Sequence, residues 1–233
     1  MQKISLPNFH KFLIYSFLTI GLAVLSYYFL DRPVAQWTYN NTKFHDWHLI
    51  WQYATYLQPM YAYLAPWYVF YFVIQIGKGR NIQSIQSWQK ILLVMIISMW
   101  FTLAVNDQLR VLFGRYWPDT WFHGNLSYIQ HKFYGFTWFK MNHEFKSFPS
   151  GHTSLIFGFM MALLWQVDNF KVKLFAIANC ILVGIGLILM CYHFVSDVII
   201  GALVGTICAY TVLYGLKISN GSRSQSKSKY SKS

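Results

Sequence analysis

The chain has 233 residues, of which 55% are hydrophobic, 20% are aromatic and only 11% are charged. A soluble domain is usually about one quarter charged, so this composition argues against a soluble protein and predicts one integral membrane domain. The formal net charge of +12 could suggest a nucleic-acid partner, but the cations lie mostly between apolar segments and at the C-terminus. Membrane topology explains that placement better, and we expect no nucleic acid to bind.

Six apolar segments follow one another along the chain, and each approaches the roughly 20 residues that a membrane span needs. They cover about residues 12–30, 60–76, 91–105, 153–167, 174–190 and 194–216. We therefore expect an all-α fold, a bundle of six transmembrane helices within residues 1–218. The third and fourth segments are short, so their helices should extend into flanking residues. The first is interpreted as a retained span, because no small-residue cleavage site follows it.

Lysine and arginine residues in the short loops predict the orientation of these spans. They cluster before the first segment, between the second and third, between the fourth and fifth, and after the sixth. The positive-inside rule places these loops and both termini in the cytoplasm. The loop of residues 106–149 then faces the opposite side, and binding of an anion explains its cations. Residues 219–233, rich in Ser and Lys, should form a disordered basic tail.

Two groups of polar residues lie at the ends of apolar segments. Pro149–His152 reads Pro-Ser-Gly-His at the start of the fourth segment, and His193 and Asp197 flank the start of the sixth. A helix that begins near Ser150 offers unpaired backbone N–H groups and a positive dipole end, which bind phosphate. His193 and Asp197 are four residues apart and share a helix face, so the Asp can orient a His that attacks or transfers a proton.

These groups are parts of three ordered blocks, which are Arg110–Pro118, Pro149–His152 and Tyr192–Asp197. In order, spacing and position at span ends, the blocks resemble those of the type-2 phosphatidic acid phosphatase superfamily of lipid phosphate phosphatases, in its bacterial membrane branch. The blocks of that family read Lys, six residues, Arg-Pro; then Pro-Ser-Gly-His; then Ser-Arg, five residues, His, three residues, Asp. The resemblance covers a catalytic core of about residues 106–201, and the six-span layout extends it to most of the chain.

The sequence departs from the family pattern at four positions. Arg110 stands where the family has Lys, and Trp117 stands where it has Arg. Gly186 and Leu187 occupy the positions of Ser-Arg in the third block. Two expected phosphate-binding cations are therefore absent from their usual places. Arg115, two residues before Trp117, is the natural substitute, because alternate residues of an extended segment point the same way.

The resemblance implies three catalytic residues. His193 would be the nucleophile and form a phosphohistidine intermediate. Asp197 would orient His193 and stabilise its charge. His152 would protonate the leaving oxygen and then activate water for hydrolysis. These roles suit the residue types, since a neutral imidazole is a good nucleophile near neutral pH and a second imidazole can act as general acid.

The resemblance also implies how the phosphate is bound. Ser150 and the N–H of Gly151 would hold phosphoryl oxygens, and Arg110 and Arg115 would neutralise their charge. We expect no cofactor and no metal, because the family needs none and no His, Asp, Glu or Cys cluster in the sequence argues for one. The three cysteines, Cys180, Cys191 and Cys208, show no disulfide or metal spacing and should only pack in the core.

We therefore expect a metal-independent phosphatase in the bacterial inner membrane, with its site on the periplasmic side. Its substrate would be a lipid phosphomonoester or pyrophosphate, such as phosphatidic acid, phosphatidylglycerophosphate, undecaprenyl pyrophosphate or a phosphorylated lipid A. Two alternatives remain open. One is a lipid phosphotransferase that uses the same phosphohistidine, and the other is a non-catalytic lipid-binding or transport protein on the same scaffold.

Overall fold

The computed structural model describes residues 4–42, 51–52, 55–80, 85–121 and 124–230. Its longer helices are α1 (Phe9–Phe29), α4 (Leu57–Gly77), α5 (Ser87–Phe113), α7 (Gly151–Leu164), α8 (Phe170–Leu189) and α9 (Val195–Tyr230). Shorter ones are α2 (Asp31–Asn41), α6 (Tyr128–His131) and the 3-10 turn η2 (His143–Phe145). Over the described ranges the chain forms isolated β-bridges but no β-strand, which confirms the expected all-α class.

The six longer helices coincide with the six apolar segments expected from the sequence. Four of them are long and apolar enough to cross a membrane, namely α1, α5, α8 and the part of α9 from Val195 to Ile218. The other two are α7, an apolar helix of 14 residues, and α4, which is rich in Tyr and Trp and contains Pro66. These apolar helices indicate an integral membrane protein. The count of six spans stays a prediction.

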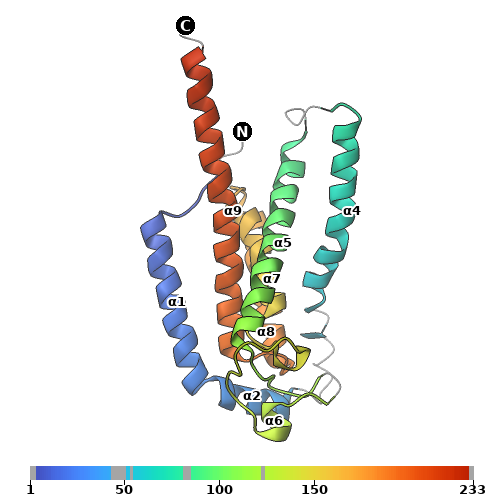
Figure 1. The fold of residues 1–233 in the computed structure, drawn as a ribbon, viewed down its shortest axis with the longest axis vertical. Helices are drawn as coiled ribbons and strands as arrows, with labels where there is room; N and C mark the ends of the chain where they lie inside the picture. The colour runs from blue at the N-terminus through green and yellow to red at the C-terminus, as the bar shows by residue number, and fades with distance from the viewer. Residues whose placement is uncertain (1–3, 43–50, 53–54, 81–84, 122–123, 231–233) are drawn as a thin grey trace.

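The two ends of the molecule along its long axis are built from different parts of the chain (Figure 1). The start of α1 and the end of α9 lie toward one end, whereas α2, α6 and the loop after α5 lie at the other. This arrangement agrees with a topology in which both termini share one side. The backbone of α9 stays helical to Tyr230, through most of the segment for which the sequence predicted disorder. Adding residues to an existing helix needs no new nucleus, which favours such an extension.

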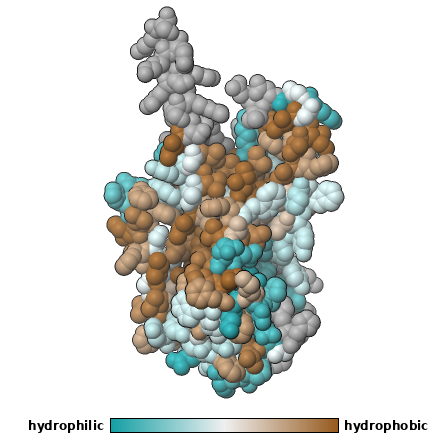
Figure 2. Space-filling model, viewed as in Figure 1, coloured by the Kyte–Doolittle hydropathy of each residue, from teal (hydrophilic) through white to brown (hydrophobic). Residues whose placement is uncertain are grey.

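The outer surface of the helices is apolar. On the face shown in Figure 2, hydrophobic residues cover much of the helical part of the molecule. Several of the most exposed side chains are large apolar or aromatic ones on α1 and α4, including Phe17 (78%), Tyr63 (77%) and Trp67 (74%). Exposed apolar area of this extent is typical of a surface that faces lipid.

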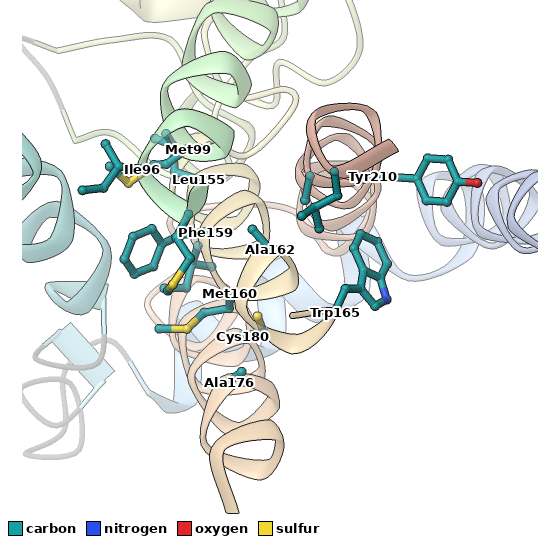
Figure 3. Close-up of a cluster of buried hydrophobic side chains, with 14 of the residues drawn as sticks. Ile96, Met99, Leu155, Phe159, Met160, Ala162, Trp165, Ala176, Cys180 and Tyr210 are labelled. Carbon is teal, nitrogen blue, oxygen red and sulfur yellow. The ribbon is translucent and has the colours of Figure 1, made fainter. Parts of the chain in front are cut away.

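The core forms around α7, which packs against α5, α8 and α9. Figure 3 shows Phe159, Met160 and Ala162 of α7 among side chains from those three helices. Cys180 of α8 belongs to this core. All three cysteines are free and buried, as the sequence predicted.

Small residues bring the backbones of α7 and α9 into direct contact. Along α9, Gly201 and Gly205 are one turn apart, and a Cβ atom at Gly205 would lie 2.2 Å from the carbonyl oxygen of Ser154. A Cβ atom at Gly201 would lie 2.8 Å from the carbonyl oxygen of Ser150. Small residues four apart allow this close approach of helices in membranes. The packing holds the N-terminal ends of α7 and α9 together.

We expect Gly205→Ala to destabilise the protein by at least ~1–3 kcal/mol, because the added methyl group must push two backbones apart. Gly215→Ala is the matched control on the same helix, since a Cβ atom there meets nothing within 4 Å. Thermal unfolding of the purified proteins in detergent measures both. Equal melting temperatures for the two variants would contradict this account of the α7–α9 contact.

Candidate active site

The three sequence blocks meet where α5 ends and where α7 and α9 begin. The side chain of Arg110, in the last turn of α5, donates from Nε to the carbonyl oxygen of Pro149 at 3.2 Å. The backbone N–H of Ser150 donates to the carbonyl oxygen of Asp197 at 3.1 Å. The Pro-Ser-Gly-His segment is therefore held from both sides, by the first block and by the third.

The N-terminus of α7 is built as an anion site. Ser150 is the N-cap residue with an extended backbone (φ −60°, ψ 118°), but its hydroxyl lies 3.0 Å from the Thr153 hydroxyl and does not cap the helix. The first N–H groups of a helix have no intrahelical acceptor and point along its axis. Gly151 and His152 occupy these first positions, so their N–H groups are available to oxygen atoms of a phosphate.

Arg110 lies directly over this helix start. A Cβ atom at Gly151 would come within 2.5 Å of Arg110 Nη2 and 3.1 Å of Nη1. Only glycine at position 151 leaves room for the guanidinium group in this position. A half-buried guanidinium beside a helix N-terminus combines a charged donor with the backbone donors that bind phosphate oxygens. The structure therefore brings together Arg110, Ser150 and Gly151, three of the four expected phosphate ligands.

His193 lies in the turn between α8 and α9, and its side chain faces Asp197. The distance from His193 Nδ1 to Asp197 Oδ2 is 3.6 Å, slightly longer than a hydrogen bond. The Asp197 carboxylate is fixed by Ser147, whose hydroxyl donates to Oδ2 at 2.7 Å, and by the N–H of Phe194 at 3.1 Å. Both ring nitrogens of His193 are buried and have no hydrogen-bond partner among the described residues.

The environment of His193 favours its neutral form. The residue is only 2% exposed. Burial lowers the pKa of the His193 imidazole below its usual value of 6.5, and the Asp197 carboxylate offsets only part of that effect. The neutral imidazole is the form that can attack an electrophile.

Aromatic rings surround the two expected catalytic histidines. The Trp117 ring lies 5.1 Å from the His193 ring between centroids. Tyr192 contacts both imidazoles, at 5.5 Å from His193 and 6.1 Å from His152. His193 and His152 therefore share one aromatic neighbour.

Arg115 is placed differently from the sequence expectation. It is fully buried, and both of its terminal nitrogens bind carboxylates: Nη1 pairs with Asp197, and Nη2 lies 2.7 Å from Asp31 Oδ2. Nη1 also donates to the Ser196 hydroxyl at 2.8 Å. This geometry does not favour the predicted role of Arg115 as a phosphate ligand, because its guanidinium fork is already occupied. Arg115 lies behind the His193–Asp197 pair and fixes the carboxylate that faces the imidazole.

The Arg115 guanidinium stays charged in this interior position. Burial opposes the charged form, but Asp197 and Asp31 outweigh burial and raise the pKa of the Arg115 side chain. The ring of Phe194 lies 4.4 Å from the guanidinium carbon, and that of Tyr27 lies 5.0 Å away. Such ring faces attract a cation, so they add to the pairing.

Asp31, at the start of α2, is the residue of this site that the sequence reasoning missed. Besides Arg115, its carboxylate accepts hydrogen bonds from both the N–H and the hydroxyl of Ser196, and from the Tyr134 hydroxyl at 3.2 Å. Asp31 lies far outside the region of family resemblance. One signal was present: a carboxylate directly after an apolar span is costly unless it is paired.

The histidines and carboxylates of the candidate site are not arranged as a metal centre in the part of the chain that the structure describes. Within the residues that the structure describes, no three His, Cys, Asp or Glu side chains lie close enough together to hold a metal ion. Metal-independent chemistry nevertheless remains a prediction that an assay must test.

Comparison with known proteins identifies the family. The sequence model of the PAP2 superfamily matches residues 89–219. The chain belongs to the PAP2 superfamily. A solved structure, LpxE of Aquifex aeolicus, is similar with a TM-score of 0.55 and 21% identity, over 79% of this chain and 95% of that one. At this identity the likeness shows a common fold. A search of curated proteins found no match. Membership confirms the resemblance seen in the three sequence blocks and indicates a phosphatase.

Asp31→Asn should destabilise the protein by ~3–5 kcal/mol, because it removes one partner of a fully buried ion pair. Asp168→Asn is the control: the Asp168 side chain is 83% exposed and its contact with Lys173 is long, at 3.8 Å, so little change is expected. Thermal unfolding in detergent compares the two. If Asp31→Asn unfolds at the same temperature as Asp168→Asn, the buried pair does not hold this region together.

Proposed function

We propose that the protein is a lipid phosphate phosphatase that hydrolyses a lipid phosphomonoester or pyrophosphate through a phosphohistidine on His193. The observation that carries the proposal is the buried His193–Asp197 pair, which lies beside the N-terminus of α7. His152 belongs to the first turn of that helix, and the Arg110 guanidinium from the end of α5 lies over it. This constellation provides a nucleophile, a group that orients it, an anion site and a second imidazole. Membership of the PAP2 superfamily supports the same reaction.

In the proposed first step, the phosphate binds at the N-terminus of α7. The N–H groups of Gly151 and His152 and the Arg110 guanidinium receive its oxygens, and they stabilise the charge that develops on these oxygens in the transition state. His193 Nε2 attacks phosphorus while Asp197 holds Nδ1 in the correct tautomer. The bond to the leaving oxygen breaks, and His152 gives that oxygen a proton.

In the second step, water takes the place of the leaving group, which is a lipid alcohol from a monoester or a lipid monophosphate from a pyrophosphate. His152, now neutral, takes a proton from the water as it attacks phosphorus, and the bond from phosphorus to His193 Nε2 breaks. The products are inorganic phosphate and free enzyme. Because Trp117 and Tyr192 cover His193, we infer that their rings shift when the phosphate enters.

Several features favour a lipid substrate on the non-cytoplasmic side. The site lies at the ends of apolar helices, where a headgroup in the bilayer surface would be within reach. The loop that completes the site is the one that the charge distribution assigns to the periplasm. Release of free phosphate without an acceptor lipid would separate hydrolysis from phosphotransfer.

His193→Ala should abolish phosphate release from lipid phosphates, since no covalent intermediate can form. His152→Ala should lower kcat by about 10²–10⁴-fold through loss of general acid–base catalysis. The control is His10→Ala, at an exposed position near the start of α1. The assay uses purified protein in excess chelator, and vanadate should inhibit it. Retention of more than about a tenth of the activity in His193→Ala would rule out the mechanism.

The pH dependence of kcat/KM should report the lowered pKa of His193. Because the neutral imidazole is the reactive form, activity should persist as the pH falls through 6.5 and decline only at more acidic values. A pH–rate profile with a soluble short-chain phosphate measures this, and thermal unfolding at each pH serves as the control for folding. An acidic limb with its midpoint above 6.5 would be inconsistent with a buried neutral nucleophile.

A further inference from the structure

Residues 138–141, which we call the aromatic lip, expose apolar side chains on the loop between α5 and α7. Phe139 is 73% exposed, Met141 is 76% exposed and Trp138 is 51% exposed. Lys140, the remaining member, is exposed as well. Three large apolar side chains in four residues are costly in a loop that faces only water, so this segment needs a partner surface.

The backbone turns the lip back along the end of α5. The N–H of Trp138 donates to the carbonyl oxygen of Phe113 at 3.2 Å, and the N–H of Phe139 donates to that of Leu112 at 3.1 Å. Trp138 and Phe139 have φ values of 40° and 56°, in the left-handed region that bulky residues rarely adopt. Such strained residues often belong to functional segments. Here the unusual backbone presents the apolar side chains on the outside of the protein.

The position of the lip relates it to the surface of the bilayer. Leu112 and Phe101 are eleven residues apart, about three helical turns, and therefore lie on one face of α5. Both are exposed, at 38% and 41%, on a helix long and apolar enough to span the membrane. The lip lies beside the last turn of this lipid-facing stripe. Trp is favoured at that depth, and Lys140 adds a charge complementary to anionic headgroups.

We propose that the aromatic lip inserts into the interface between headgroups and acyl chains, in the leaflet that holds the substrate. In the sequence, the lip falls between two residues of the site. These are Arg110, at the end of α5, and Ser147, which binds Asp197. Its insertion sets the α7 N-terminus at headgroup depth and helps a lipid phosphate to reach it. The proposed insertion follows from the geometry of the loop alone. The proposed effect on substrate binding rests on the phosphatase function proposed above.

Fluorescence quenching in phosphatidylglycerol vesicles tests the insertion without any assay of activity. A single cysteine replaces Phe139 in a background without native cysteines and carries an environment-sensitive dye. Gln130, exposed on α6, is the matched control position. A lipid with a doxyl group near the headgroup end of its chain should quench the dye at 139, and iodide should quench the dye at 130. Strong iodide quenching at 139 would overturn the proposal, and so would protection from both quenchers, which indicates that a second protein copy covers the lip.

Kinetics test the effect on substrate in the chain with its native cysteines. The double variant Phe139→Asp/Met141→Asp should raise KM for a two-chain lipid phosphate in vesicles by ~10-fold or more, since it removes two apolar groups that the proposal places in the bilayer. Its kcat/KM for a water-soluble short-chain phosphate should stay near that of wild type. Phe139→Leu/Met141→Leu is the control and should keep wild-type values for both substrates. Equal losses on both substrates in the Asp variant would contradict a role at the membrane surface.

Discussion

The arrangement of the candidate site depends on a single buried guanidinium, that of Arg115, which is shared by Asp31 and Asp197. An ion in a protein interior is tolerated only when it is paired, so each of these three groups requires the others. The pairing ties α2 to the start of α9 through the loop that follows α5. It also holds the carboxylate of Asp197 in place, and that carboxylate faces the His193 ring at 3.6 Å. The orientation of His193, the proposed nucleophile, thus depends on Asp31, a residue more than 160 positions earlier in the chain.

The charges of this network also suit the chemistry. The Arg115 guanidinium stabilises the charged form of Asp197, so an ionised carboxylate lies behind a neutral imidazole. In the proposed mechanism that charge would stabilise His193 when it becomes positively charged by bonding to phosphorus, as in other His–Asp pairs. Because Arg115 neutralises part of the charge on Asp197, the carboxylate orients the imidazole and does not keep it protonated at rest. The Arg110 guanidinium lies over the N-terminus of α7, where we propose that it binds the phosphate.

Close packing of α7 against α9 joins the phosphate site to the nucleophile. The absence of a side chain at Gly201 lets the carbonyl of Ser150 approach α9, and the N–H of Ser150 then reaches the carbonyl oxygen of Asp197. The anion-binding N–H groups and the His–Asp pair therefore belong to one rigid unit of two helices. Rigid placement of this kind supports catalysis, because the donors need no reorganisation as charge develops.

Much of this architecture could be predicted from the sequence. Hydropathy located the six long helices. The positions of Pro149–His152, His193 and Asp197 indicated that the N-terminal ends of α7 and α9 meet. The alternation of side chains along an extended segment suggested that Arg115 substitutes for a phosphate-binding Arg at position 117, but it could not show that two carboxylates bind the Arg115 guanidinium instead. Asp31 was out of reach, because its partners come from packing between distant segments that carry no local periodicity. The contact of Tyr192 with both His152 and His193 also arises from tertiary packing, so the sequence could not predict it.

If His193 carries the phosphoryl group, rapid-quench labelling can capture the phosphorylated protein. A lipid phosphate with a radioactive phosphoryl group is mixed with wild-type protein, with His152→Ala and with His193→Ala, and the denatured proteins are digested. The account predicts acid-labile, base-stable label on the peptide that contains His193, longer-lived in His152→Ala because water is no longer activated, and absent from His193→Ala. Hydrolysis by wild-type protein with label on no peptide, or on a different residue, would contradict the account.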